Sequence, residues 1–191
     1  MPYKIISVVK LRKIIFLTGN PGIGKTTVLM KTVEELKKKG FSVGGIISRE
    51  VREDGLRVGF KIFDLYTGKE GWLAHVKQVA GPTIGKYKVC LADLESIGAK
   101  AILNASTKAS IVVIDEVGPM ELFSQSFKDA IRAALKSDKR IIGIIHYKAS
   151  DPIIAEIKKR GDSEVIEVSL HNRETLPELI VRDISESLSK N

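Results

Sequence analysis

The segment from Gly19 to Thr26 reads Gly-Asn-Pro-Gly-Ile-Gly-Lys-Thr and fits the pattern G-x-x-x-x-G-K-[ST]. Gly19 and Gly24 permit backbone torsions that direct successive N–H groups at one anion. A helix that begins near Lys25 adds the positive end of its dipole. Lys25 is then expected to reach β- and γ-phosphates, and the Thr26 hydroxyl is expected to bind Mg²⁺. The motif follows an apolar run, Ile14–Leu17, and opens an amphipathic segment, so it predicts a nucleotide-phosphate site.

A second group of chemical interest is the acid pair Asp115 and Glu116, which ends the apolar run Ile111–Ile114. A buried strand that emerges beside the phosphate-binding loop would bring Asp115 to Mg²⁺, directly or through water. Glu116 points the other way along the pleat, where it is expected to orient and deprotonate a water that attacks the γ-phosphate. The alternative is that Glu116 only caps the following turn.

The segment from Asp115 to Gly118 also fits the D-x-x-G pattern of switch GTPases. Three features weigh against that interpretation. Pro119 stands where many such proteins carry glutamine, and no guanine-reading N/T-K-x-D motif follows, since residues 107–110 lack the final aspartate and precede the strand. The double acid is more typical of ATPases with a catalytic glutamate. We therefore expect weak base selectivity.

Composition limits the remaining classes. The 191 residues include 31 Lys and Arg against 23 Asp and Glu, a net charge of +8 that attracts anions of any kind. No apolar run reaches the ~18–20 residues of a membrane span, and basic residues interrupt any N-terminal signal core. Cys90 is the single cysteine and is expected to be buried, which excludes an internal disulfide and favours a cytoplasmic protein. The many Lys, Glu and Ile are typical of a thermophile.

The order of the predicted elements indicates the fold. Apolar runs predict strands at 14–17, 42–48, 110–114, 140–145 and 163–168, and periodic segments predict helices at 26–39, 91–104, 123–135, 152–159 and 174–188. Segments 57–63 and 71–76 predict an antiparallel hairpin around Thr67-Gly68, and 81–89 is predicted as a loop. We expect a single α/β domain over 1–191: a three-layer P-loop NTPase sandwich whose sheet is mostly parallel, with an N-terminal extension (1–13) and a hairpin insertion (about 57–76).

Five stretches carry a resemblance to a known family: GNPGIGKTT at 19–27, SREVREDGLRVGF at 48–60, GKY at 85–87, VVIDEVGPMELF at 112–123 and HNRE at 171–174. Over residues 14 to about 185 the chain resembles the small P-loop nucleoside-triphosphatases first recognised in hyperthermophilic bacteria and archaea, which have a human cancer-related relative. The phosphate loop alone is common to many families. The pattern at 115–123 is far more specific.

The resemblance implies slow, Mg²⁺-dependent hydrolysis of several nucleoside triphosphates (ATP, GTP, CTP, UTP) to diphosphate and phosphate, with little discrimination between bases. The motifs themselves predict Lys25 and Glu116 in catalysis and Thr26 and Asp115 at the metal. Residues 1–13 are extra relative to the family and indicate either a misassigned start or an added edge strand. The resemblance places nucleotide contacts on two segments: Gly19, Asn20, Pro21, Gly22, Ile23, Gly24, Lys25, Thr26 and Thr27, and Ile111, Val112, Val113, Ile114, Asp115, Glu116, Val117 and Gly118.

Weaker candidates surround these motifs. His146 ends a strand expected beside that of Asp115, where it either senses the γ-phosphate or bonds a loop carbonyl. We expect no arginine to be permanently docked in cis, and Lys37–Lys39 to be a solvated helix end. The remaining candidates are Arg49, Arg52, Arg57, Arg132 and Arg173 as charge stabilisers, and Trp72, Tyr87, Phe123 and Tyr147 for stacking on a base, although core packing accounts for the aromatics equally well.

Two other functions share the phosphate loop. A nucleoside- or nucleotide-kinase-like phosphotransferase would need an acceptor pocket, for which the hairpin and residues 81–88 supply a wall. A nucleic-acid-stimulated ATPase would use the net charge of +8, but the chain lacks interleaved aromatic and basic stretches, so nucleic acid is not favoured as a partner. The sequence leaves the oligomeric state open.

Overall fold

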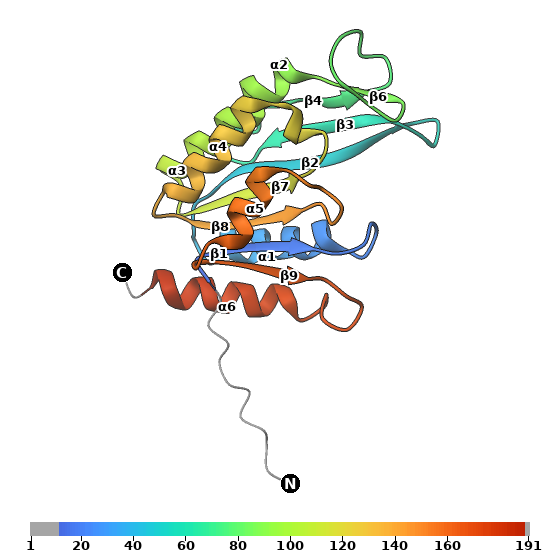
Figure 1. Cartoon of the computed structure of the whole chain (residues 1–191). Helices are drawn as coiled ribbons and strands as arrows, with labels where there is room; N and C mark the ends of the chain where they lie inside the picture. The colour runs from blue at the N-terminus through green and yellow to red at the C-terminus, as the bar shows by residue number, and fades with distance from the viewer. Residues whose placement is uncertain (1–11, 190–191) are drawn as a thin grey trace.

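A computed structural model describes residues 12–189 (Figure 1). Predictions for residues 1–11, including an added edge strand, lie outside the described residues. The strands are β1 Ile14–Thr18, β2 Val43–Glu53, β3 Leu56–Asp64, β4 Glu70–His75, β5 Thr83–Ile84, β6 Tyr87–Val89, β7 Ile111–Val117, β8 Arg140–Ile145 and β9 Ser163–Glu167. The helices are α1 Lys25–Lys38, α2 Leu91–Asp93, the π-helical η1 Leu94–Ala99, α3 Lys100–Lys108, the 3₁₀ turn η2 Glu121–Phe123, α4 Gln125–Lys136, α5 Pro152–Lys159 and α6 Leu176–Leu188.

The nine strands form one sheet in the order β5-β6-β4-β3-β2-β7-β8-β1-β9. The half from β2 to β9 is parallel, and β8 lies between β1 and β7. Because parallel strands run in one direction, the carboxyl ends of β1, β8 and β7 meet at the same edge. The fold therefore brings the loop after β1 and the acids of β7 to one place.

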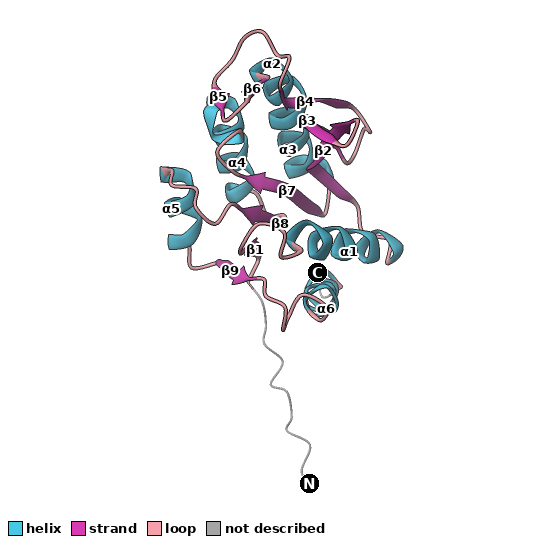
Figure 2. Ribbon diagram, turned by 90° about the vertical axis from the view of Figure 1, so that its right-hand side faces the viewer, coloured by secondary structure: helices cyan, strands magenta, loops and turns pink. Residues whose placement is uncertain are grey.

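Helices cover both faces of the sheet and complete the three expected layers (Figure 2). Ile14 and Phe16 of β1 pack into the cluster under α3, α4 and α5, whereas Ile15 and Leu17 pack against α1 and α6. All four side chains are fully buried. Strands with two covered faces need continuous apolar runs, and this is why the parallel strands lack alternation. The predicted α/β fold is confirmed.

The other half of the sheet is an antiparallel wing, formed by β2 beyond Ile46 together with β3, β4, β5 and β6. The predicted pairing of the hairpin strands is confirmed, with Phe60 opposite Ala74. The wing is larger than the predicted hairpin, because β2 continues past β7 and pairs with β3 along Ile46–Glu53. β2 is thus the one strand that connects the parallel half to the wing.

The predicted loop at 81–89 is wrong, because this segment contains β5 and β6. Strands of two and three residues are too short to show an alternating pattern, and Pro82 and Gly85 resemble turn residues. Cys90 was expected to be buried but is partly exposed. The helix predicted at 152–159 is confirmed as α5, and the Asp151 carboxylate caps its start by accepting a hydrogen bond from the Ile153 N–H at 3.0 Å. No helix within residues 12–189 is long and apolar enough to cross a membrane.

Gly45 provides a test of the β2–β7 junction. Its φ is +107°, and a Cβ at this position would overlap the Val113 carbonyl oxygen. We expect Gly45→Ala to cost roughly 2–4 kcal/mol of stability, a fall in Tm of about 5–15 °C by calorimetry. Gly161→Ala is the control, because a Cβ there meets nothing within 4 Å. Equal melting temperatures for the two variants would contradict the close approach at the junction.

Candidate functional site

The phosphate loop (residues 19–26) connects β1 to α1 and folds around its own lysine. The Lys25 Nζ donates hydrogen bonds to the Gly19 carbonyl at 2.9 Å and the Asn20 carbonyl at 3.1 Å. Gly19 and Gly24 have φ of +136° and +109°, which residues with a side chain rarely adopt. A Cβ on Gly19 would also lie 2.8 Å from the Val168 carbonyl oxygen. The glycines allow a tight turn that leaves the lysine on the inner side of the loop.

The acid of β7 lies against this loop. Asp115 is only 2% exposed, and burial raises its pKa to about 7, with a further contribution from the neighbouring Glu116 carboxylate. The Thr26 hydroxyl and the Lys25 ammonium oppose this shift of the Asp115 pKa, because each lies close enough to stabilise the carboxylate. The two motifs that the sequence placed 90 residues apart therefore meet in space.

Glu116 and His146 lie beside this contact. The His146 backbone N–H donates to the Val117 carbonyl at 3.1 Å, which continues the β7–β8 pairing beyond the strand. Burial raises the pKa of Glu116, and electrostatic interactions with His146 and Lys25 partly offset the rise. A carboxylate with a raised pKa is a stronger base than an ordinary glutamate.

A cavity of about 530 Å³ opens above these groups. One wall is the phosphate loop and the start of α1, a second is formed by Glu116 and His146, and the antiparallel wing forms the third. The lining residues are Pro21, Gly22, Gly24, Lys25, Thr26, Thr27, Glu50, Arg57, Phe60, Glu116 and His146. A nucleotide triphosphate tail on the loop would extend into this space.

The donor set fits Mg²⁺. The Asp115 Oδ2 is buried and has no hydrogen-bond partner among the described residues, an arrangement that a cation would compensate. Within residues 12–189 there is no group of three or more His, Cys, Asp or Glu residues placed to hold a metal. Magnesium bound with substrate phosphates needs only one or two protein ligands, and the hydroxyl of Thr26 and the carboxylate of Asp115 supply oxygens of the required kind.

Five of the predicted contact residues lie inside the sheet. Ile111, Val112, Val113, Ile114 and Val117 are fully buried. Their side chains are enclosed in the sheet, and the nucleotide contacts that the resemblance places on this strand stay a prediction. They contribute by holding Asp115 and Glu116 at the edge of the sheet.

The arginine candidates differ in whether they lie at the cavity or away from it. Arg132 pairs with Asp129 and Glu156 on the helical layer, and Arg52 pairs with Glu50. Arg173 approaches the loop, with its Cδ 3.7 Å from where a Cβ on Gly24 would stand. Arg57 lines the cavity itself, which does not by itself test the expectation that no arginine is permanently docked in cis.

The aromatic candidates do not gather at the cavity. Trp72 packs against His75, with ring centroids 4.4 Å apart. Phe123, the last residue of η2, and Tyr147, which follows β8, are both exposed. Tyr87 is buried and accepts a hydrogen bond from the Nε of Arg57 at 2.9 Å. The aromatic residue that does line the cavity is Phe60, which the sequence analysis did not single out.

Sequence reasoning also missed Glu121. Its side chain is 4% exposed, and burial, followed by repulsion from Glu116, raises its pKa to about 8. The backbone N–H groups of Gly118 and Glu121 oppose this shift. The signal was present in the MELF motif at 120–123, but nothing in its spacing indicates that the glutamate turns inward. Three carboxyl groups therefore cluster at the end of β7.

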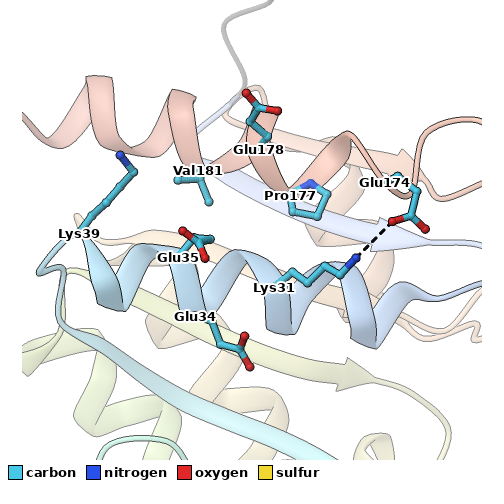
Figure 3. A pocket seen from close by; sticks show the side chains of 8 residues that line it. All are labelled: Lys31, Glu34, Glu35, Lys39, Glu174, Pro177, Glu178 and Val181. Carbon is cyan, nitrogen blue, oxygen red and sulfur yellow. Dashed lines mark hydrogen bonds and ion pairs between the residues drawn. The ribbon is translucent and has the colours of Figure 1, made fainter.

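A second hollow, of about 400 Å³, lies between α1 and α6 (Figure 3). Lys31 pairs with Glu174 across it at 3.2 Å, and both side chains are more than half exposed. Surface ion pairs of this kind contribute little. None of the phosphate-loop residues or the acids of β7 lines this hollow, so it is separate from the site.

A glycine loop closed by Lys-Thr between the first strand and helix of a parallel sheet, with an acidic strand end beside it, defines the P-loop NTPase class. A family model described as NTPase matches residues 14–181. The nucleoside-triphosphatase THEP1 of Thermofilum pendens is 49% identical over 175 residues, covering 91% of this chain and 96% of that protein. The nucleoside-triphosphatase THEP1 of Methanosarcina acetivorans is 50% identical over 167 residues, which cover 87% of this chain and 93% of that protein.

Two solved structures of nucleoside triphosphatases resemble this chain in fold as well as in sequence. A human cancer-related nucleoside triphosphatase has a TM-score of 0.77 and 37% identity, covering 91% of this chain and 97% of that one. THEP1 from the hyperthermophile Aquifex aeolicus has a TM-score of 0.76 and 27% identity, covering 88% and 97%. The chain belongs to the NTPase family and is an enzyme of the hydrolase class.

The raised pKa of Glu121 makes stability depend on pH. Between the ordinary value of 4.5 and about 8, the folded state keeps a proton that the unfolded state has lost. This contribution is fully present below pH 4.5 and is lost as pH rises through 8. The side chain in Glu121→Gln stays neutral at every pH. Between pH 5.5 and pH 9 we therefore expect the unfolding free energy of the wild type to fall by at least about 2 kcal/mol more than that of Glu121→Gln.

Urea unfolding at both pH values measures this difference. The control is Glu95→Gln, at an exposed position on η1, which should lose as much unfolding free energy between the two pH values as the wild type. A Glu121→Gln protein whose stability falls as steeply as that of the wild type would show that Glu121 is not held protonated by burial.

Proposed function

We propose that this protein hydrolyses nucleoside 5′-triphosphates to nucleoside diphosphate and phosphate in a Mg²⁺-dependent reaction. The observation that supports it best is that Asp115 interacts with the Thr26 hydroxyl and with the charge of Lys25, at one end of a cavity lined by Thr26, Lys25 and Glu116. The named activity of the relatives, nucleoside-triphosphatase, supports the same reaction.

The phosphate loop binds the triphosphate tail in this proposal. Backbone N–H groups of residues 19–26 and the amino end of α1 attract the phosphate oxygens. Lys25 exchanges its bonds to the Gly19 and Asn20 carbonyls for β- and γ-phosphate oxygens. These contacts involve only atoms that ATP, GTP, CTP and UTP share, which supports low base selectivity.

Thr26 and Asp115 would hold Mg²⁺, which would neutralise the negative charge that develops on the phosphate groups. The metal would also compensate the buried Asp115 carboxylate, whose Oδ2 has no protein partner among the described residues. Holding this carboxylate ionised is favourable only beside positive charge, because burial raises its pKa to about 7.

Glu116 acts as the general base. It orients a water in the cavity and takes one of its protons as the water oxygen bonds to the γ-phosphorus. The bond from the γ-phosphorus to the bridging oxygen breaks, and its electron pair leaves with the nucleoside diphosphate. His146, at the end of the intervening strand, lies on the same wall and stabilises the Glu116 carboxylate.

Replacing the base tests this assignment. We expect Glu116→Gln to bind nucleotide with unchanged affinity and to lower kcat by roughly 10²–10⁴-fold, because the amide cannot accept the proton. Phosphate release from ATP, GTP, CTP and UTP without any added acceptor measures kcat. The control is Glu178→Gln, at an exposed position on α6. Wild-type turnover by Glu116→Gln would remove Glu116 from the reaction.

Metal dependence tests the second assignment. Asp115→Asn removes the charge but keeps the shape of the side chain. We expect the Mg²⁺ concentration for half-maximal hydrolysis to rise at least about tenfold, since a neutral amide is a weaker ligand for a hard cation. A Mg²⁺ titration of phosphate release measures it. An unchanged midpoint would show that Asp115 does not hold the metal.

A further inference from the structure

The antiparallel wing contributes a cation to the cavity at the phosphate loop. Glu50 of β2 and Arg57 and Phe60 of β3 line the same cavity as Lys25 and Glu116. Glu116 marks the part of the cavity where the proposed function places the attacked phosphorus. Arg57 is therefore a second positive side chain that lines this space, and it comes from a different element than Lys25.

The guanidinium of Arg57 is held from three strands. Its Nε donates to the Tyr87 Oη of β6 at 2.9 Å, and its Nη1 donates to the Glu50 Oε2 of β2 at 3.3 Å. The group also lies over the Phe60 ring of β3, 5.2 Å from the ring centroid. Although the Arg57 side chain is 45% exposed, these contacts fix its orientation. A long side chain that is already ordered loses less entropy when it binds an anion.

The sheet fixes this arginine relative to the catalytic acids. Arg57 pairs with Arg52 of β2, and the same strand pairs with β7 through Ile46 opposite Ile114, the residue before Asp115. A hydrogen-bonded ladder, with one register shift between Val51 and Arg52, therefore connects the wing wall to the acid wall. Such a ladder holds both walls in one rigid frame.

Arg57 also has N–H groups that bind no protein acceptor among the described residues. Among residues 12–189, its hydrogen bonds involve Nε and Nη1, so the two N–H groups of Nη2 have no protein acceptor. Charge on the equatorial oxygens of a transferring phosphoryl group is stabilised by an arginine in many phosphoryl-transfer enzymes. The phosphate loop with Lys25 and the wing with Arg57 both line the cavity in which the proposed function places that group.

We propose that Arg57 is a catalytic residue supplied in cis, whose guanidinium contacts the γ-phosphoryl oxygens in the transition state. Glu50 and Tyr87 position it for that contact. This inference rests on the proposed function, because it assigns Arg57 a place in the same hydrolysis. It also gives the antiparallel wing a role in the chemistry: the wing carries the arginine together with the groups that orient it.

The test compares Arg57→Ala with Arg52→Ala. Arg52 also pairs with Glu50 and lies on the same wing, but it does not line the cavity. We expect Arg57→Ala to lower kcat at least about 30-fold while KM changes less than about threefold, since the contact forms in the transition state. Arg52→Ala should keep both values within about twofold of the wild type.

Two further measurements separate catalysis from structure. Added guanidinium ion at low millimolar concentration should restore part of the kcat of Arg57→Ala and should not change the wild type. Arg57→Lys should recover only part of the rate, because an ammonium lacks the planar fork of donors. If Arg57→Ala melts early, Tyr87→Phe, which removes only the hydroxyl that accepts from Nε, should still lower kcat several-fold at unchanged KM.

Wild-type kcat in Arg57→Ala, or a rise in KM alone, would overturn the inference. So would a loss of rate that neither guanidinium nor lysine restores in a folded protein. Failure of the proposed function would show differently: the wild type would release no phosphate, or Glu116→Gln would turn over normally whatever Arg57 does.

Discussion

The interaction of one buried carboxylate, that of Asp115, with the phosphate loop is the constraint that governs the rest of the fold. Asp115 is almost fully buried, and burial disfavours its charged form. Thr26 and Lys25 provide the opposing interactions, and a divalent cation would add to them. The carboxyl ends of β1, β8 and β7 must therefore remain in register within an ångström or so, because the Thr26 hydroxyl and the Asp115 carboxylate act over short distances.

The architecture satisfies this constraint with continuous apolar strands. Fully buried side chains on both faces of β1 and β7 leave the strands no freedom to slide, since a shift of one residue would exchange the two faces. β2 extends the same frame outward and carries the wing. The cavity is thus bounded by three walls that belong to one sheet and to the helix that begins at its edge.

Much of this was predictable from sequence because the information is local. The phosphate loop, the apolar runs and the acid pair each lie within a few residues, and their chemistry follows from their spacing. The size of the wing was not predictable, because β5 and β6 are too short to show periodicity. Glu121 was missed because its burial depends on how η2 folds back over β7. The five arginines looked alike in sequence, and only the strand register places Arg57 on the cavity wall.

The most direct test of the central claim is a crystal structure of the Glu116→Gln protein with ATP and Mg²⁺. We predict that the γ-phosphate lies within hydrogen-bond distance of the Lys25 Nζ, and that the metal is bound by the Thr26 hydroxyl and, directly or through one water, by Asp115. A triphosphate bound away from the phosphate loop, or a metal that contacts neither Thr26 nor Asp115, would contradict the account.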